Sequence, residues 1–214
     1  MKLERDTSPD GTRIYKTPSG KAYPSVTTVT GLHNAKGITE WRRRVGEEEA
    51  NKISSYATSF GTAIHKIIED YINNKESFLD FAKPQEKWVF NAAQNYLDKI
   101  DGVYCQEGCL YSDVLQLAGR TDCIAEYEGI PSVIDFKTAR KAKEEAWIKS
   151  YFLQATAYSL MFEELTGISV PQIVIILMTY SGEVTVFKKQ RKDYYEDLKE
   201  VIYEDRRNQS SHRS

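Results

Sequence analysis

The sequence predicts an α/β (α+β) fold in which one mixed central β-sheet is flanked by helices. Three observations support this. The first hundred residues are mostly helical in periodicity, the middle of the chain alternates like three strands, and a long helical segment then precedes two further strands and a last helix. The 214 residues suffice for one sizeable core, so we expect a single domain.

The N-terminal part predicts a small hairpin followed by helices. A Pro18-Ser19-Gly20 turn separates two short strand-like segments, which indicates a hairpin over residues 12–24. Ser25 is a candidate cap for a short helix. Capping residues and periodicity place the helices of this part over residues 26–30, 39–54, 58–73 and 84–100.

The middle and the C-terminal part contain the strands. Alternating residues predict strands over 103–111, 115–127 and 132–138. A helix over 143–166 ends at Gly167, and a hairpin over 172–180 and 183–188 turns at Ser181-Gly182. A final helix over 191–205 leaves residues 206–214 as a frayed tail.

Composition excludes several classes of protein. The formal net charge is only −2, so any contact with nucleic acid must use local basic clusters. An odd number of cysteines (Cys105, Cys109 and Cys123) argues against a disulfide framework. No apolar run could span a bilayer. The N-terminus carries acidic residues, unlike a secretory signal or an acid-poor organelle presequence. These features predict a cytoplasmic protein without a membrane partner.

Two acids are expected to meet across the central hairpin. If Glu128-Gly129 forms the two-residue turn, Asp122 lies opposite Asp135 and Arg120 lies opposite Lys137. Facing carboxylates repel one another, and a divalent cation between them removes the conflict.

Hard oxygen ligands favour Mg²⁺ or Mn²⁺ in such a site. Lys137 shares the face of Asp135 and could hold a water nucleophile or neutralise charge on a phosphate. Metal, acids and lysine together predict a phosphodiesterase. The alternative is an exposed, solvated Asp-x-Lys pair, which is the ordinary meaning of that pattern alone.

Two helices offer further candidate residues, each with a structural alternative. His65 and Glu69 share a helix face, so His65 could bind a metal while Glu69 orients its other ring nitrogen. A core-edge histidine paired with a glutamate is the alternative. Gln154 and Tyr158 are also four residues apart and could meet a substrate strand, or Tyr158 could be a core aromatic.

One local basic cluster stands out. Trp41 is followed by Arg42, Arg43 and Arg44, which suits phosphate contacts and base stacking. A solvated helix face that carries a packed tryptophan explains the same pattern almost as well.

Taken in order, four motifs resemble the PD-(D/E)xK nuclease superfamily and its RecB-like exonuclease branch. The motifs lie between residues 61 and 158, and each is weak alone. They read G-x-x-x-H (Gly61, His65), G-R-x-D (Gly119, Arg120, Asp122), D-x-K-T (Asp135, Lys137, Thr138) and Q-x-x-x-Y (Gln154, Tyr158). Residues 23–29 and the following Trp-Arg segment also resemble the mitochondrial genome maintenance exonucleases and their phage and bacterial relatives.

The resemblance implies a restriction-endonuclease-like core, here over residues 58–205, with an N-terminal hairpin and helical extension over 1–57. It implies that Asp122, Asp135 and Lys137 are catalytic, and that His65, the two acids and the main-chain carbonyl near Phe136 bind the metal. It implies that Gln154 and Tyr158 lie by the DNA path. The other predicted DNA contacts are Trp41, Arg42, Arg44, Arg120 and Thr138.

The implied substrate is DNA with a free end, single-stranded. The absence of targeting signals predicts a bacterial or phage enzyme of replication, recombination or repair, which could work with a protein of that pathway. The separated cysteines of the iron–sulfur members are missing, so no cluster is expected. A related endonuclease, and a non-catalytic DNA-binding protein on the same fold, remain alternatives.

Overall fold

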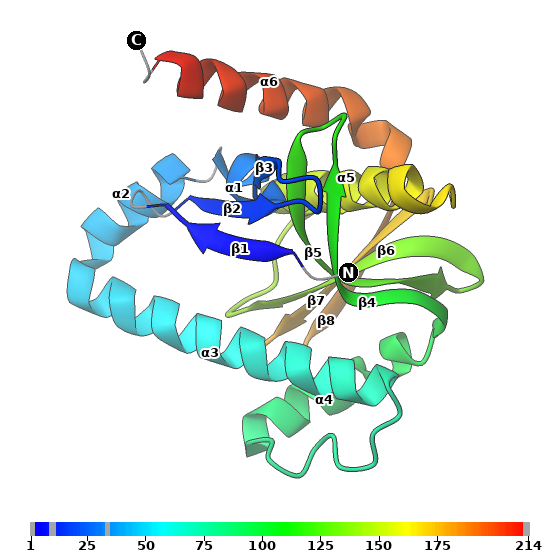
Figure 1. Cartoon of the computed structure of the whole chain (residues 1–214). Helices are drawn as coiled ribbons and strands as arrows, with labels where there is room; N and C mark the ends of the chain where they lie inside the picture. The colour runs from blue at the N-terminus through cyan, green and yellow to red at the C-terminus, as the bar shows by residue number, and fades with distance from the viewer. Residues whose placement is uncertain (1–2, 9–11, 33–34, 212–214) are drawn as a thin grey trace.

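The predicted fold class is confirmed: a mixed β-sheet lies at the centre of the molecule, with helices on both faces (Figure 1). The computed structural model describes residues 3–8, 12–32 and 35–211. The order of strands in the sheet is β4-β5-β6-β7-β8. Their bounds are β4 Ile100–Ser112, β5 Leu117–Tyr127, β6 Ile130–Ala139, β7 Gln172–Thr179 and β8 Val184–Gln190.

The sheet is mixed because one of its connections is a crossover. Strands β6 and β7 are parallel, whereas the other neighbouring pairs are antiparallel. Parallel neighbours need a long connection, and helix α5 (Lys149–Thr166) supplies it. Gly167 ends α5 in the left-handed conformation, with φ 75°, as the sequence predicts.

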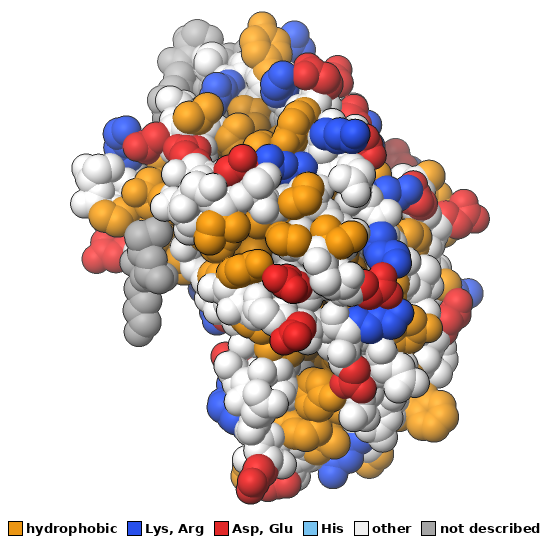
Figure 2. All heavy atoms as spheres, turned by 90° about the vertical axis from the view of Figure 1, so that its right-hand side faces the viewer, with side chains coloured by type: hydrophobic (Ala, Val, Ile, Leu, Met, Phe, Trp, Pro, Cys, Tyr) orange, Lys and Arg blue, Asp and Glu red, His pale blue; other side chains and the backbone are white. Residues whose placement is uncertain are grey.

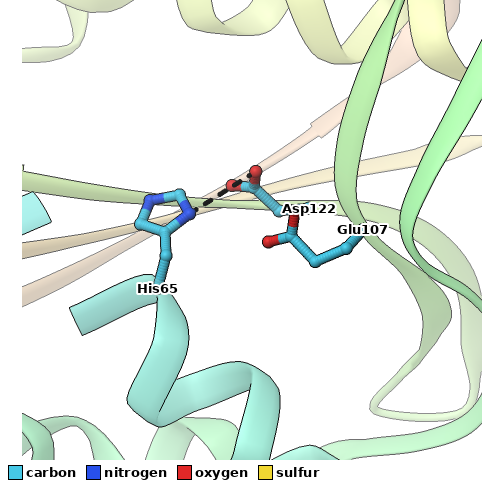
Figure 3. Close-up of side chains that lie close together, drawn as sticks. All are labelled: His65, Glu107 and Asp122. Carbon is cyan, nitrogen blue, oxygen red and sulfur yellow. Dashed lines mark ion pairs between the residues drawn. The ribbon is translucent and has the colours of Figure 1, made fainter. Parts of the chain in front are cut away.

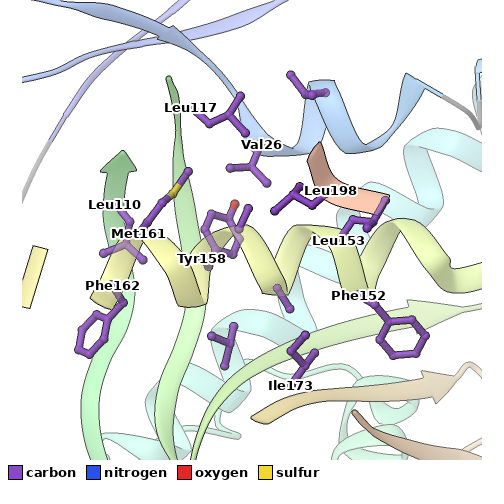
Figure 4. Close-up of a cluster of buried hydrophobic side chains, with 14 of the residues drawn as sticks. Val26, Leu110, Leu117, Phe152, Leu153, Tyr158, Met161, Phe162, Ile173 and Leu198 are labelled. Atoms are coloured by element: carbon purple, nitrogen blue, oxygen red, sulfur yellow. The ribbon is translucent and has the colours of Figure 1, made fainter. Parts of the chain in front are cut away.

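Two hydrophobic layers hold the helices to the sheet. Helices α3 (Glu47–Ile72) and α4 (Pro84–Leu97) cover one face, where Ile64, Phe90 and Ile134 share a buried cluster. Helix α5 covers the other face and carries Phe152 and Tyr158 into a second cluster (Figure 4), and α6 (Tyr195–Ser211) packs on α5. Burial of apolar surface in both layers fixes where each helix lies on the sheet.

A second, three-stranded sheet precedes these helices. It consists of β1 (Glu4–Thr7), β2 (Arg13–Lys16) and β3 (Ala22–Pro24), and short helices α1 (Val26–Thr30) and α2 (Ala35–Val45) follow. The predicted hairpin is β2–β3, whereas β1 was not expected. Its four residues are all exposed, so the alternation that marks a half-buried strand is missing.

The sequence predicted a break between the second and third helices at residues 55–57, and this prediction is wrong. Helix α3 runs through Thr58 and Ser59 without interruption, and the break falls at Gly46, whose φ is 86°. Thr and Ser favour helix caps but are also tolerated on a helix surface, so they were weak signals. A positive φ, which glycine adopts without a steric cost, ends α2 and redirects the chain.

The helices after β6 and β8 also differ from the expectation. A 3-10 helix, Glu145–Ile148, precedes α5, and another, Arg191–Tyr194, precedes α6. Residues 206–211 are helical rather than frayed: Arg206 Nη2 donates to the Leu115 carbonyl at 3.0 Å and ties this turn to the body of the protein. The rest of the predicted tail, 212–214, lies outside the described residues. No helix among the described residues is long and apolar enough to cross a membrane.

Candidate metal and catalytic site

The central hairpin has the predicted register. Tyr127 pairs with Ile130 across the turn, and the β5–β6 ladder continues to the pair Cys123–Ile134. Asp122 and Asp135 come directly after this last pair. The main-chain N–H of Phe136 donates to Asp122 Oδ2 at 2.9 Å. Where the ladder ends, this side-chain carboxylate therefore accepts the hydrogen bond in place of a main-chain carbonyl.

Three potential ligands converge beside the end of this ladder. They are His65 on α3, Glu107 on β4 and Asp122 on β5, and their ligand atoms lie within 4.8 Å of one another. His65 Nδ1 is 3.6 Å from Asp122 Oδ1, and the Glu107 carboxylate points toward both side chains (Figure 3). Helix α3 must cross the sheet at this point for the three groups to meet.

Glu107 was not predicted. It lies between the pairs Gln106–Cys123 and Gly108–Thr121, which puts it across the β4–β5 ladder from Asp122. Its φ of 49° is unusual for a residue other than glycine. A four-residue connection between Ser112 and Leu117 sets this register. From the sequence we expected the strands to end at 111 and begin at 115, which implies a shorter loop and a different register. The pairing of Glu107 with Asp122 was therefore missed.

Both ring nitrogens of His65 face this site. Nε2 lies 2.8 Å from the main-chain oxygen of Phe136, and Nδ1 faces Asp122. The expectation that Glu69 orients the ring is therefore wrong. The Glu69 carboxylate accepts from Lys66 at 3.2 Å, because side chains three residues apart also share a helix face.

Asp135 and Lys137 form a buried ion pair next to the three converging ligands. Lys137 Nζ lies 2.7 Å from Oδ1 and 2.6 Å from Oδ2 of Asp135, which is 1% exposed. Burial raises the pKa of Asp135 to about 6, although the Lys137 charge acts in the opposite direction. Burial lowers the pKa of Lys137, but the charges of Asp135 and Asp122 outweigh it, so this pKa lies above its usual value and the ammonium stays charged.

The donor set suits a hard divalent cation. Two carboxylates, one imidazole and a main-chain carbonyl are ligands that Mg²⁺ and Mn²⁺ accept. The sequence predicted Asp135 as a shared ligand, whereas the converging group contains Glu107 in its place. Asp135 Oδ2 lies 2.6 Å from the Lys137 ammonium, so Asp135 stands beside the group with its charge compensated by that lysine.

Gln154 and Tyr158 lie in the interior and not on a surface that DNA could reach. Gln154 is 8% exposed and donates to Asp135 Oδ1 at 3.2 Å. Tyr158 is 1% exposed, and its hydroxyl fills the space beside Gly119, where an added Cβ would lie 2.7 Å away. The expected DNA contacts are thus replaced by support for Asp135 and by core packing.

The remaining motif residues have mixed outcomes. The β5–β6 ladder ends at the pair Cys123–Ile134, before the predicted pair of Arg120 and Lys137. On the other side of β5, Arg120 pairs with Cys109 of β4, and its Nε lies 2.7 Å from Glu107 Oε2. Thr138 is half-buried, and its hydroxyl would lie 3.3 Å from a Cβ added at Gly61, so α3 approaches β6 closely at this point.

The Trp-Arg cluster lies on α2, away from the β5–β6 hairpin in Figure 1. Trp41 and Arg42 are half-buried, and Arg44 is exposed. Arg42 Nε donates to Glu47 at 3.3 Å and its Nη2 contacts Asn51, so this guanidinium already has partners. Arg44 is exposed, and its contact with DNA stays a prediction.

The family follows from a comparison with known protein families. Residues 39–210 match the model of the PD-(D/E)XK nuclease superfamily, which is most of the chain. This chain belongs to the PD-(D/E)XK nuclease superfamily. The match spans the Trp41–Arg44 cluster, the four motifs between Gly61 and Tyr158, and Glu107.

Three curated relatives are similar to part of this chain. Mitochondrial genome maintenance exonuclease 1 of Homo sapiens is 29% identical over 147 residues, which cover 63% of this chain and 42% of that protein. The Xenopus tropicalis protein is 30% identical over 150 residues, with the same coverages, and the Mus musculus protein is 28% identical over 110 residues, or 50% and 32%. The chain thus spans less than half the length of these relatives. A solved structure of a protein from Eubacterium rectale is 8% identical to this chain, with a TM-score of 0.46. The alignment covers 67% of this chain and 63% of that protein.

Proposed function

We propose that this protein is a metal-dependent deoxyribonuclease that removes nucleotides from the free ends of single-stranded DNA, in replication, recombination or repair. The observation that carries this proposal is the convergence of His65, Glu107 and Asp122 beside the buried Asp135–Lys137 pair. The name of the curated relatives, a genome maintenance exonuclease, supports the mode of attack and the process.

The converging group would hold Mg²⁺ or Mn²⁺ through His65, Glu107 and Asp122, with Asp135 and the Phe136 carbonyl beside it. A bound cation supplies charge neutralisation at the scissile phosphate and a lower pKa for a coordinated water. The hydrogen bond from the Phe136 N–H keeps Asp122 turned toward this group. His65 would leave its direct hydrogen bond to Phe136 when both bind the same ion.

Lys137 is proposed to stabilise negative charge on the phosphate. Asp135 holds its ammonium in one position, and Gln154 in turn holds Asp135. A cation fixed in this way needs little reorganisation when charge develops in the transition state. An open cleft of about 310 Å³, with Lys66 and Arg120 on its walls, leads from the surface to His65 and Glu107 and gives a strand access.

The experiment that tests the function is degradation of end-labelled linear single-stranded DNA. Wild type and Lys137→Ala are compared with Mg²⁺, Mn²⁺ or a chelator. We expect loss of label only for the wild type, and only with a metal. Cleavage that persists in the chelator or in the variant would contradict the proposed site, and absence of cleavage with every metal on single and double strands would leave a DNA-binding role.

Circular single-stranded DNA separates exonuclease from endonuclease. An exonuclease leaves the circle intact, whereas an endonuclease with the same chemistry opens it. Labels at the 5′ and the 3′ end of the linear substrate then give the polarity of digestion.

A further inference from the structure

A basic surface with an exposed tryptophan follows the strand that carries Asp135 and Lys137. Residues 139–143 and Trp147 line a cleft of about 500 Å³. Arg140, Lys141 and Lys143 supply three positive charges in this segment, and Trp147 is 65% exposed. The indole of Trp147 contributes little to the stability of the fold, because it buries little apolar area there. An exposed aromatic ring at the edge of a basic cleft instead indicates a binding surface.

The two cations at the start of the segment are available for a ligand. Arg140 and Lys141 are exposed, and neither forms an ion pair with a described residue. Two acids, Glu144 and Glu145, follow closely in the chain, but Lys189 Nζ lies 2.5 Å from Glu145 and neutralises it. The charge of the cleft is therefore positive where the segment leaves β6.

Tyr151 connects this surface to the candidate catalytic lysine. The Lys137 ammonium lies 5.1 Å from the centre of the Tyr151 ring, and the Lys143 ammonium lies at the same distance. Lys143 also donates to the Tyr151 hydroxyl at 2.8 Å. A strand bound along residues 139–143 would therefore lie next to the Asp135–Lys137 pair.

Trp147 also lines a second cleft, which has the opposite charge. This cleft has a volume of about 380 Å³, and its other walls include Asp197, Glu200 and Glu204. Lys149 also lines this cleft, where it pairs with Asp197 at 2.9 Å, so acidic side chains outnumber basic ones in the lining. A phosphodiester backbone would be repelled from it and confined to the basic cleft. Figure 2 shows one face of the molecule, on which acidic and basic side chains are mixed.

We propose that this surface binds the single-stranded substrate next to the active site, with a base stacked on Trp147 and phosphates on Arg140 and Lys141. The proposal rests on the proposed function, because it assigns the substrate path of that site. Aromatic rings beside cations bind single strands of any sequence, since every base presents a π-face. Trp41, half-buried beside an arginine that already has partners, is a weaker platform.

The test is binding of fluorescently labelled oligothymidylate, followed by anisotropy with Ca²⁺ in place of the catalytic metal. Wild type is compared with Trp147→Ala, and Trp88→Ala is the matched control because Trp88 is 61% exposed on α4. Loss of one stacked base should weaken binding by roughly 10-fold for Trp147→Ala and leave Trp88→Ala unchanged. Equal affinities of wild type and Trp147→Ala overturn the proposal.

An oligonucleotide of abasic sites separates stacking from a general loss of structure. It keeps the phosphates, so Trp147→Ala should bind it as wild type does, while Lys141→Glu should weaken its binding and Lys141→Arg should not. An equal loss on both oligonucleotides for Trp147→Ala would also overturn the stacking role.

Hydrolysis of bis(p-nitrophenyl) phosphate distinguishes failure of this inference from failure of the proposed function. This small diester needs the catalytic site but has no strand that could extend along residues 139–143. Unchanged binding of oligothymidylate by Trp147→Ala, with the diester still hydrolysed by wild type, rejects the inference alone. Failure of wild type to hydrolyse the diester or any DNA rejects the function, and the binding comparison still decides the role of Trp147.

Discussion

Glu107 lies across the β4–β5 ladder from Asp122, and the two carboxylates converge with His65. Burial raises the pKa of Glu107, and the neighbouring Asp122 charge raises it further. Arg120, 2.7 Å from Glu107, offsets part of this repulsion, and a metal cation between the two carboxylates would remove the rest, which is the physical reason to regard Glu107 as a ligand.

Glu107→Gln should therefore lower both metal affinity and nuclease activity. Loss of groups that only support a ligand costs about 10–100-fold in metal affinity or activity, so loss of a ligand should cost at least as much. The measurement is the Mn²⁺ dependence of DNA degradation. Glu126→Gln, an acid of β5 that accepts a hydrogen bond from Tyr104, is the control and should keep wild-type dependence. Normal metal dependence in Glu107→Gln would remove this residue from the site.

Gln154→Leu should lower kcat without weakening DNA binding. Gln154 is buried and holds Asp135, so its loss frees a carboxylate that positions Lys137. We expect a decrease of roughly 10–100-fold in kcat. Gln172→Leu is the matched control, since Gln172 is a buried amide that bonds Ser132 instead. A rise in the Kd for DNA with unchanged kcat would instead favour a direct DNA contact.

Gly119→Ala should destabilise the fold. The added methyl group would lie 2.7 Å from the Tyr158 hydroxyl and 2.9 Å from Cε1 of the same ring, in a packed interior. Overpacking of this kind costs about 1–3 kcal/mol in the free energy of unfolding. Urea denaturation measures the loss, and adding Tyr158→Phe should recover part of it by removing the hydroxyl. If the double variant is the sum of the single variants, the contact is not the cause.

The stability that Glu128 provides should disappear in acid. Hydrogen bonds from Lys188 and Lys99 lower the pKa of Glu128 from 4.5 to about 2. A lowered carboxyl pKa stabilises the folded state above the ordinary value, and this contribution is lost as pH falls from about 4.5 through about 2. Wild type should therefore exceed Glu128→Gln in urea midpoint at neutral pH, and the difference should shrink at pH about 3. A difference that is constant with pH, or insensitive to salt, would contradict the ion pairs.

Local patterns in the sequence determined the order of helices and strands and the register of the central hairpin. The Glu128-Gly129 turn sets that register, because a two-residue turn leaves one pairing for the strands beside it. The sequence alone therefore places Asp122, Asp135 and Lys137 near one another. The same reasoning missed β1, which has no apolar alternation, and misplaced the break that lies at Gly46.

The tertiary structure alone decided which groups meet. Glu107 enters the site because a four-residue connection sets the β4–β5 register, and His65 enters it because α3 crosses the sheet there. Gln154 and Tyr158 share one helix face in the sequence, but packing of α5 on the sheet turns that face inward. Helical spacing shows which side chains lie together, whereas only burial against a distant strand shows whether they meet substrate or core.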